Sequence, residues 1–173
     1  MDEIEVKIPG VSHEELAPKL LSLGAKKTFE GILDTRLFDT DDSKIEKSDE
    51  VLRLRKEGYK TFITYKQTLP SDFAKKKKET EVEVSDFETA KELLLVLGFK
   101  EIDKFEKKRI SYKLDKIKIE FDKFLGKEDF VPEFMEIEAE TEKELYKYIE
   151  ILGFSKEECK NWGRLKMIKH YSK

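Results

Sequence analysis

The sequence predicts an α+β protein built on about eight mostly antiparallel strands, with two to four helices packed outside them. Two observations predict this class. A unit made of a Glu-x-Glu strand, a polar break, an amphipathic helix and Leu-Gly occurs three times along the 173 residues. Between these units, apolar and charged residues alternate, as is typical of strands that bury one face. No linker or low-complexity stretch divides the chain, so we expect one domain over residues 1–173.

The three repeated units carry signals at both ends of their helices. Each unit closes on a Gly, where a helix C-terminus favours a left-handed residue, and each helix start has the spacing of a capping box. The units run from Glu3 to Gly24, from Glu81 to Gly98 and from Glu136 to Gly153, with capping boxes at Ser12–Glu15, Ser85–Glu88 and Thr141–Glu144. Pro18 interrupts the first helical pattern and predicts a kink or a late start.

The remaining strands lie between these units. Alternating segments occur around residues 37–39, 51–55, 61–66, 105–112 and 117–122. Residues 57–58 and 115–116 supply the turns of two hairpins. The run Lys75–Lys78 is expected to be a solvated loop; the alternative is a cationic collar that steers anions to a binding site.

The charge composition excludes several classes of partner. Charged residues make up 42% of the chain, yet 35 basic and 38 acidic side chains leave a net charge of only −3. This balance predicts no chain-wide basic surface for nucleic acid. The longest apolar run, residues 93–97, is too short to span a membrane, and the N-terminus lacks a signal-peptide pattern. We therefore expect a cytoplasmic monomer or homodimer with no nucleic-acid or membrane partner.

Sorting each predicted strand by face puts charge along almost the whole of one face. This polar set, in which every residue except Thr64 is charged, is Glu3, Glu5, Lys7, Arg53, Arg55, Thr64, Lys66, Glu79, Glu81, Glu83, Lys107, Arg109, Lys118, Glu120, Asp122, Glu136 and Glu138. One interpretation is an open sheet with a wet face. The other is a closed eight-stranded barrel whose interior is charged and whose apolar outside is covered by helices. The segregation of acids and bases onto different strands favours the barrel.

A charged interior is stable only if its charges pair across it or bind a ligand. Carboxylate clusters suit Mg²⁺ or Mn²⁺, which prefer oxygen ligands. Guanidinium and ammonium groups suit the oxygens of a polyphosphate. A metal between the two sets would neutralise charge on a transferring phosphoryl group. The pattern therefore indicates phosphate-transfer chemistry.

The order of the charged motifs resembles the CYTH superfamily, or triphosphate tunnel metalloenzymes, and most closely its class IV adenylate cyclase-like branch, which is related to the thiamine triphosphatases. The resemblance covers residues 3–154. The motifs that carry it are Glu3-x-Glu5-x-Lys7, residues 49–55, residues 64–66, residues 79–84, residues 107–109, residues 121–122 with 125–126, and residues 134–138.

The resemblance implies an antiparallel eight-stranded tunnel that holds a triphosphate together with Mg²⁺ or Mn²⁺. It implies three sets of site residues. The metal ligands would be Glu3, Glu5, Asp122, Glu136 and Glu138. The triphosphate would contact Lys7, Arg53, Arg55, Lys66, Lys107 and Arg109, and Glu81, Glu83 and Glu120 would be supporting acidic lining. Glu136, Glu138 and Lys66 are the expected catalytic residues.

Departures from the family pattern bear on the substrate. Lys77 stands where the family often has Arg, Leu37 replaces a Tyr, and the loop from Lys127 to Pro132 is longer than usual. The leading hypothesis is a cyclase that converts ATP into cyclic AMP and pyrophosphate. A phosphohydrolase acting on inorganic triphosphate, thiamine triphosphate or a nucleoside triphosphate is the alternative. A non-catalytic polyphosphate- or nucleotide-binding module is the third hypothesis.

Overall fold

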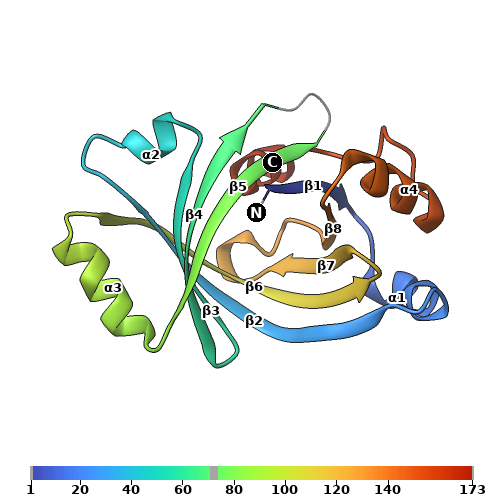
Figure 1. Ribbon diagram of the computed structural model, residues 1–173, viewed down its shortest axis with the longest axis horizontal. Helices are drawn as coiled ribbons and strands as arrows, with labels where there is room; N and C mark the ends of the chain where they lie inside the picture. Colours follow the sequence, from blue (N-terminus) through green and yellow to red (C-terminus); the bar gives the residue numbers. More distant parts are fainter. Residues whose placement is uncertain (1, 71–73, 173) are drawn as a thin grey trace.

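Eight strands close into a barrel in the computed structural model of the protein (Figure 1). The structure describes residues 2–70 and 74–172, and the side chains of Asp2, Glu3 and Lys75 lie outside the described part. The strand order around the barrel is β1-β5-β4-β3-β2-β6-β7-β8, and each neighbouring pair is antiparallel. The predicted α+β class with a closed antiparallel barrel is therefore confirmed, and the open-sheet interpretation is wrong.

The elements follow the predicted order, with longer strands than the alternating segments alone indicate. The strands are β1 Asp2–Pro9, β2 Lys26–Asp39, β3 Val51–Glu57, β4 Lys60–Leu69, β5 Lys75–Val84, β6 Lys100–Leu114, β7 Ile117–Phe124 and β8 Phe134–Ala139. The helices are α1 His13–Ser22, α2 Lys44–Lys47, α3 Phe87–Val96, α4 Glu142–Leu152 and α5 Arg164–Tyr171, with a 3-10 turn at Gly126–Glu128. Among the described residues, none of these helices has the length and apolarity needed to cross a membrane.

The helix ends agree with the sequence signals at most positions. Gly24, Gly98 and Gly153 all adopt positive φ after a helix, as a left-handed C-terminal residue should. Thr141 caps α4 by accepting a hydrogen bond from the Glu144 amide.

The structure corrects four local expectations about helices and loops. Helix α3 is capped by Asp86, one residue after the predicted Ser85, because the Asp86 carboxylate accepts from the Thr89 amide. Helix α1 begins at His13 with Pro18 inside it, so there is no late start, and Ser12 makes no side-chain cap. Five α-helices are described where two to four are expected. The run Lys75–Lys78 begins β5 and is not a loop.

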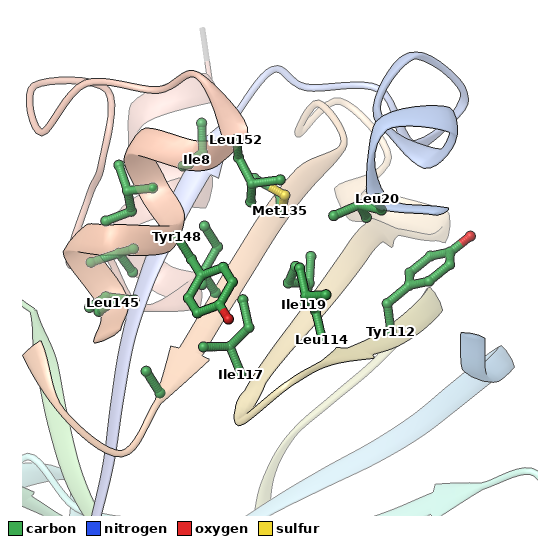
Figure 2. Close-up of a cluster of buried hydrophobic side chains, with 14 of the residues drawn as sticks. Ile8, Leu20, Tyr112, Leu114, Ile117, Ile119, Met135, Leu145, Tyr148 and Leu152 are labelled. Carbon is green, nitrogen blue, oxygen red and sulfur yellow. The ribbon is translucent and has the colours of Figure 1, made fainter. Parts of the chain in front are cut away.

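Two apolar clusters fill the space between barrel and helices. Residues from α1 and α4 pack on the outer face of the sheet formed by β1, β6, β7 and β8. Figure 2 shows Leu145, Tyr148 and Leu152 of α4 over Ile117 of β7 and Met135 of β8. On the opposite side of the barrel (Figure 1), Phe87 and Leu94 of α3 pack against outward-facing residues of β2 and β3. The hydrophobic core therefore lies between the outer face of the barrel and the helices, and the charged face of the strands points into the barrel.

A third apolar cluster closes one end of the barrel. Phe124 and Phe134 project inward at the end of β7 and the start of β8, and Met167 of α5 is completely buried against them. The chain reaches α5 through a backbone bridge in which Lys7 and Lys160 exchange two hydrogen bonds of 2.8 Å. The C-terminal segment therefore forms part of the wall at this end of the barrel.

Candidate functional site: a charged tunnel with an adjoining cavity

The inside of the barrel is a cavity of about 240 Å³ lined mainly by charged side chains. Because successive side chains on a strand point to opposite faces, the residues that face the cavity alternate with those that pack in the core outside the barrel. The charged lining consists of Glu5, Lys7, Arg53, Arg55, Lys66, Lys77, Glu79, Glu81, Lys107, Arg109, Lys118, Glu120, Glu136, Glu138 and Arg164. Both signs of charge are thus collected around one small volume.

Strand register places two acids and one base side by side in each of two rows across β1, β8 and β7. Glu5 lies directly opposite Glu138, and the next inward position pairs Lys7 with Glu136. On the other side of β8, Glu136 lies opposite Glu120. Directly opposite residues have Cβ atoms roughly 5 Å apart, so these carboxylates are near neighbours.

Two cations hold the carboxylates of this wall together. The Lys7 Nζ lies 3.0 Å from Glu5 and 2.7 Å from Glu136. The Arg109 guanidinium contacts Glu120, donates from Nε to Asp122 at 2.6 Å and donates from Nη2 to Glu136 at 2.9 Å. The arrangement is a buried network in which each acid has a basic partner.

This network lowers the pKa values of Glu120 and Glu136 and raises those of Lys7, Lys118 and Arg109, whereas burial and the neighbouring Arg109 lower the pKa of Lys107. Burial alone would raise the pKa of Glu120, but Arg109 and Lys118 outweigh it and lower that pKa to about 2. Burial likewise opposes ionisation of Glu136, and Lys7, Lys107 and Arg109 together hold its pKa well below the usual range. Burial disfavours the charged form of Lys7, yet Glu136 and Glu5 raise its pKa. Glu120, Glu136 and Lys7 are therefore charged at neutral pH.

The opposite wall, formed by β3, β4 and β5, carries three of the six residues of the predicted triphosphate set, namely Arg53, Arg55 and Lys66. Lys66 contacts Glu79, and the Arg53 Nη2 lies 3.7 Å from Glu81. The Arg55 Nη2 lies 3.1 Å from Glu57. The buried Arg55 Nε has no hydrogen-bond partner among residues 2–70 and 74–172. A buried donor without an acceptor is costly, so Arg55 suits an anion entering the cavity.

The structure brings most of the predicted site residues together. Glu5, Glu81, Glu120, Glu136, Glu138 and all six predicted triphosphate contacts line the cavity. Asp122 lies on the inner face of β7 but is fully buried, and Lys107 and Arg109, which line the cavity, donate to it. Glu83 is exposed and pairs with Lys60 at 3.0 Å, away from the cavity. The backbone of Glu3 lies on β1, but its side chain lies outside the described residues.

Four lining residues were given no role in the predicted site. Glu79 and Lys118 already fell on the charged face by alternation, so that signal was available. Lys77 is buried at the start of β5, and comparison of the sequence with the family pattern already marks it as a Lys where Arg is common. Arg164 begins α5 directly after Gly163. No sequence pattern predicted that its side chain lines the cavity, because the position of a residue at a helix N-terminus does not indicate which neighbours it contacts.

The carboxylates fit a divalent cation in chemistry but are not arranged around one. Glu5, Glu138, Glu136 and Glu120 offer oxygen donors from three adjacent strands, the donor type that Mg²⁺ and Mn²⁺ prefer. Within the described part of the chain, however, no three acidic, His or Cys residues converge closely enough to hold a metal. Lys7 and Arg109 now take the coordination places that a cation would use, so a bound metal would compete with them for Glu136.

A second cavity of about 690 Å³ adjoins the tunnel at the end covered by α5. Its lining includes apolar side chains such as Leu52, Leu69 and Ile102, together with Asp49 and Asn161. The two cavities share lining residues, namely Leu37, Val51, Lys77, Gly163 and Arg164. Ligand pockets usually measure about 300–1,000 Å³. The second cavity therefore has the size of a small-molecule site, and the tunnel alone is smaller.

The sequence matches the CYTH domain family over residues 1–154. The chain belongs to the CYTH family. This assignment confirms the resemblance carried by the ordered charged motifs, and the barrel and its charged interior are the family feature that those motifs build.

Individual relatives agree with the assignment. A Methanocaldococcus jannaschii protein named as a candidate adenylate cyclase is 30% identical over 158 residues, which span 88% of each chain. A solved structure from Pyrococcus horikoshii is 29% identical, with a TM-score of 0.79 over 95% of this CYTH chain and 98% of that one. A Hippeastrum protein, described as a candidate adenylyl cyclase with a dominant triphosphatase activity, shares the fold at 15% identity, with a TM-score of 0.69 over 98% and 95% of the two chains.

Proposed function

We propose that this protein is a divalent-metal-dependent enzyme that binds the triphosphate of ATP in its tunnel and forms cyclic AMP and pyrophosphate. The observation that carries the proposal is the cavity in which the charged groups of β3, β4 and β6 are all basic, whereas its carboxylates come from β1, β5, β7 and β8. A polyanion and a cation can bind there side by side, because each set stabilises one of them.

The basic residues have distinct parts in this proposal. Arg53 and Arg55 offer planar forks that match phosphate oxygens in pairs, and the buried Arg55 Nε would gain the acceptor it lacks. Lys66 and Lys107 act as point charges on the same phosphates, and Lys66 is the proposed catalytic cation of this wall. By holding the chain of phosphates in line, these residues would orient the α-phosphorus toward the 3′-hydroxyl, whose attack expels pyrophosphate.

The acidic wall would hold the metal through Glu5, Glu136 and Glu138, with Glu120 as a supporting neighbour. When bound there, Mg²⁺ or Mn²⁺ supplies charge neutralisation and orientation of the attacking oxygen. Asp122 fits a supporting part better than a ligand's part, because both its oxygens already accept from Arg109. It would fix the Arg109 side chain beneath the site.

The cyclase and the hydrolase differ in what must sit beside the triphosphate. A nucleotide needs room for a base and a sugar next to the tunnel, and the adjoining cavity of about 690 Å³ supplies that room. The name of the Methanocaldococcus relative points in the same direction. Hydrolysis of a triphosphate stays the alternative, and the Hippeastrum protein of the same fold is described with that activity.

The proposal is tested by incubating the protein with ATP, thiamine triphosphate or inorganic triphosphate in Mg²⁺ or Mn²⁺ and following the products. Cyclic AMP with pyrophosphate identifies a cyclase, whereas orthophosphate identifies a hydrolase. Tight binding without any product would favour the non-catalytic module. That third hypothesis is less well supported, because a pure anion receptor gains nothing from carboxylates that face its ligand.

A paired substitution links turnover to the acidic wall. Glu136→Gln with Glu138→Gln should abolish metal-dependent turnover, because amides cannot supply the two anionic oxygen ligands. Glu83→Gln is the matched control and should keep full activity, since Glu83 lies outside the cavity and pairs with an exposed Lys60. Circular dichroism would check that both variants fold, and full activity of the folded double variant would rule out the proposed metal ligands.

A further inference from the structure

Arg164 joins three separate parts of the chain at the boundary between the two cavities. Its Nε donates to Glu128 at 2.9 Å, its Nη2 contacts the other oxygen of that carboxylate, and its Nη1 lies 2.5 Å from Asp103. The guanidinium also stacks over the Phe105 ring, 4.1 Å from the centroid. We call Arg164, Asp103, Glu128 and Phe105 the Arg164 clamp.

The clamp is partly buried, with the Asp103 side chain 26% exposed, and its hydrogen bonds are used internally. The Arg164 side chain is 13% exposed and that of Glu128 is 5% exposed. One guanidinium faces two carboxylates, so the clamp carries a formal charge of −1 and repels a phosphate. Lys7 and Arg109 also contact more than one carboxylate, but Arg164 differs from them because neither Asp103 nor Glu128 is a proposed metal ligand. A metal bound in the tunnel would therefore not release Arg164 for a phosphate.

The clamp holds the segment that separates the cavities. Gly163 and Arg164 line both of them, and Asn161, Leu165 and Lys166 line the larger one. This segment is tied at one side by the backbone bridge at Lys160 and at the other by the buried Met167. Between these two points, the Arg164 clamp fixes the wall to β6 and to the 126–128 turn.

We propose that Arg164 is a positioning residue that determines whether the protein accepts the organic group of a triphosphate ester. The inference rests on the proposed function, in which the tunnel holds the triphosphate and the adjoining cavity holds the nucleoside. By fixing the wall between them, the clamp keeps the larger cavity in the shape that receives the nucleoside. Arg164 itself makes no contact with phosphate.

A selective effect on binding follows from this geometry. The groups proposed to hold the phosphates project from strands of the closed barrel, so they stay in place when the clamp is lost. The wall of the larger cavity would instead become mobile, and a ligand that packs against it would bind less tightly. Loss of the clamp should therefore weaken ATP binding and leave inorganic triphosphate binding unchanged.

The experiment compares the two probes, ATP and inorganic triphosphate, by calorimetry in EDTA, where no metal-dependent turnover consumes them. Arg164→Gln alone would leave Glu128 buried without its partner, so the main variant is the double substitution Arg164→Gln with Glu128→Gln. We expect its Kd for ATP to rise about tenfold, and its Kd for inorganic triphosphate to stay within about twofold of the unmodified protein. Arg164→Lys keeps the charge but loses the fork, and we expect an intermediate ATP defect.

Arg36 offers a matched control. It also contacts two carboxylates, Asp34 and Glu101, and lies over the Phe87 ring, but it is not part of either cavity lining. Arg36→Gln should change neither Kd. An equal loss of affinity for both probes in the folded double variant, or no loss for either, would overturn the proposal for Arg164. If the unmodified protein binds neither probe in EDTA or in Mg²⁺, the proposed function itself fails, and the role of Arg164 fails with it.

Discussion

Arg109 is a residue whose charge is needed by three buried carboxylates at once. Its guanidinium contacts Glu120, Asp122 and Glu136, and its side chain is 5% exposed. We predict that Arg109→Met lowers the free energy of unfolding by about 3–5 kcal/mol, because removing one partner leaves buried charge uncompensated. Urea denaturation would measure the loss. Lys60→Met, which breaks an exposed pair with Glu83, should cost far less, because exposed ion pairs contribute little to stability; equal losses would contradict a buried network.

Glu120 should make the stability of the barrel depend on acid pH. Arg109 and Lys118 overcome the effect of burial and lower its folded pKa to about 2. Glu120 therefore contributes stability above the ordinary carboxyl pKa of about 4.3, and this contribution is lost as the pH falls toward 2. In Glu120→Gln, the slope of unfolding free energy against pH between about 4.3 and 2 should be shallower by about 1.4 kcal/mol per pH unit, because the variant no longer takes up one proton on unfolding. Glu83→Gln should keep the original slope.

At the level of single residues, alternation predicted which face of a strand a side chain occupies, but not how far along the tunnel it lies. Glu81 and Glu83 are equivalent by period, yet Glu81 lines the cavity and Glu83 is exposed beside Lys60. The difference arises because the strands tilt and the barrel ends before Glu83, which depends on register between distant strands. Asp122 shows the same limit, since it shares the inner face of β7 with Glu120 yet is fully buried by Lys107 and Arg109 of β6.

At the level of elements, the start of α3 tests a one-residue correction. The Asp86 carboxylate accepts from the Thr89 amide at 2.7 Å, whereas the sequence pattern favoured Ser85 with Glu88. Asp86→Ala should lower the unfolding free energy by about 1 kcal/mol, because an orphan amide of the first turn loses its acceptor. Ser85→Ala should leave it within about 0.5 kcal/mol. Thermal denaturation would measure both, and a larger loss in the Ser85 variant would restore the predicted cap.

Elements were predictable where local pattern and tertiary context agree. The hairpins β3–β4 and β6–β7 and helix α4 follow from alternation, turn residues and a capping box. The start of β5 was not predictable, because four successive lysines show no alternation, and only pairing with β1 and β4 makes them a strand. Helix α5 was likewise hidden, since its role depends on Met167 meeting Phe124 and Phe134, which come from two distant strands.

At the level of the whole molecule, the near-neutral balance of a highly charged chain is partly explained by the tunnel. Acids and bases face one another there, and in the absence of ligands they neutralise each other through pairs such as Lys7 with Glu136. Composition could not indicate this, because it does not show which charges share a volume. Sorting the strand residues by face did indicate that acids and bases lie together. Because the barrel is closed, that charged face encloses a single interior volume in which the charges meet.

The same pairing predicts that metal and triphosphate assist each other's binding. A triphosphate that attracts Lys7 and Arg109 leaves Glu136 without its partners, and a cation that binds Glu136 releases both bases for the phosphates. By linkage, Mg²⁺ should lower the Kd for inorganic triphosphate severalfold, and triphosphate should lower the Kd for Mg²⁺ by the same factor, beyond their association in free solution. Calorimetry with a protein-free titration as reference would measure this coupling. Glu136→Gln should reduce it to near zero while Glu83→Gln preserves it. Independent binding of the two ligands to the unmodified protein would show that the two charged walls of the tunnel do not share Glu136 in the way the ion pairs indicate.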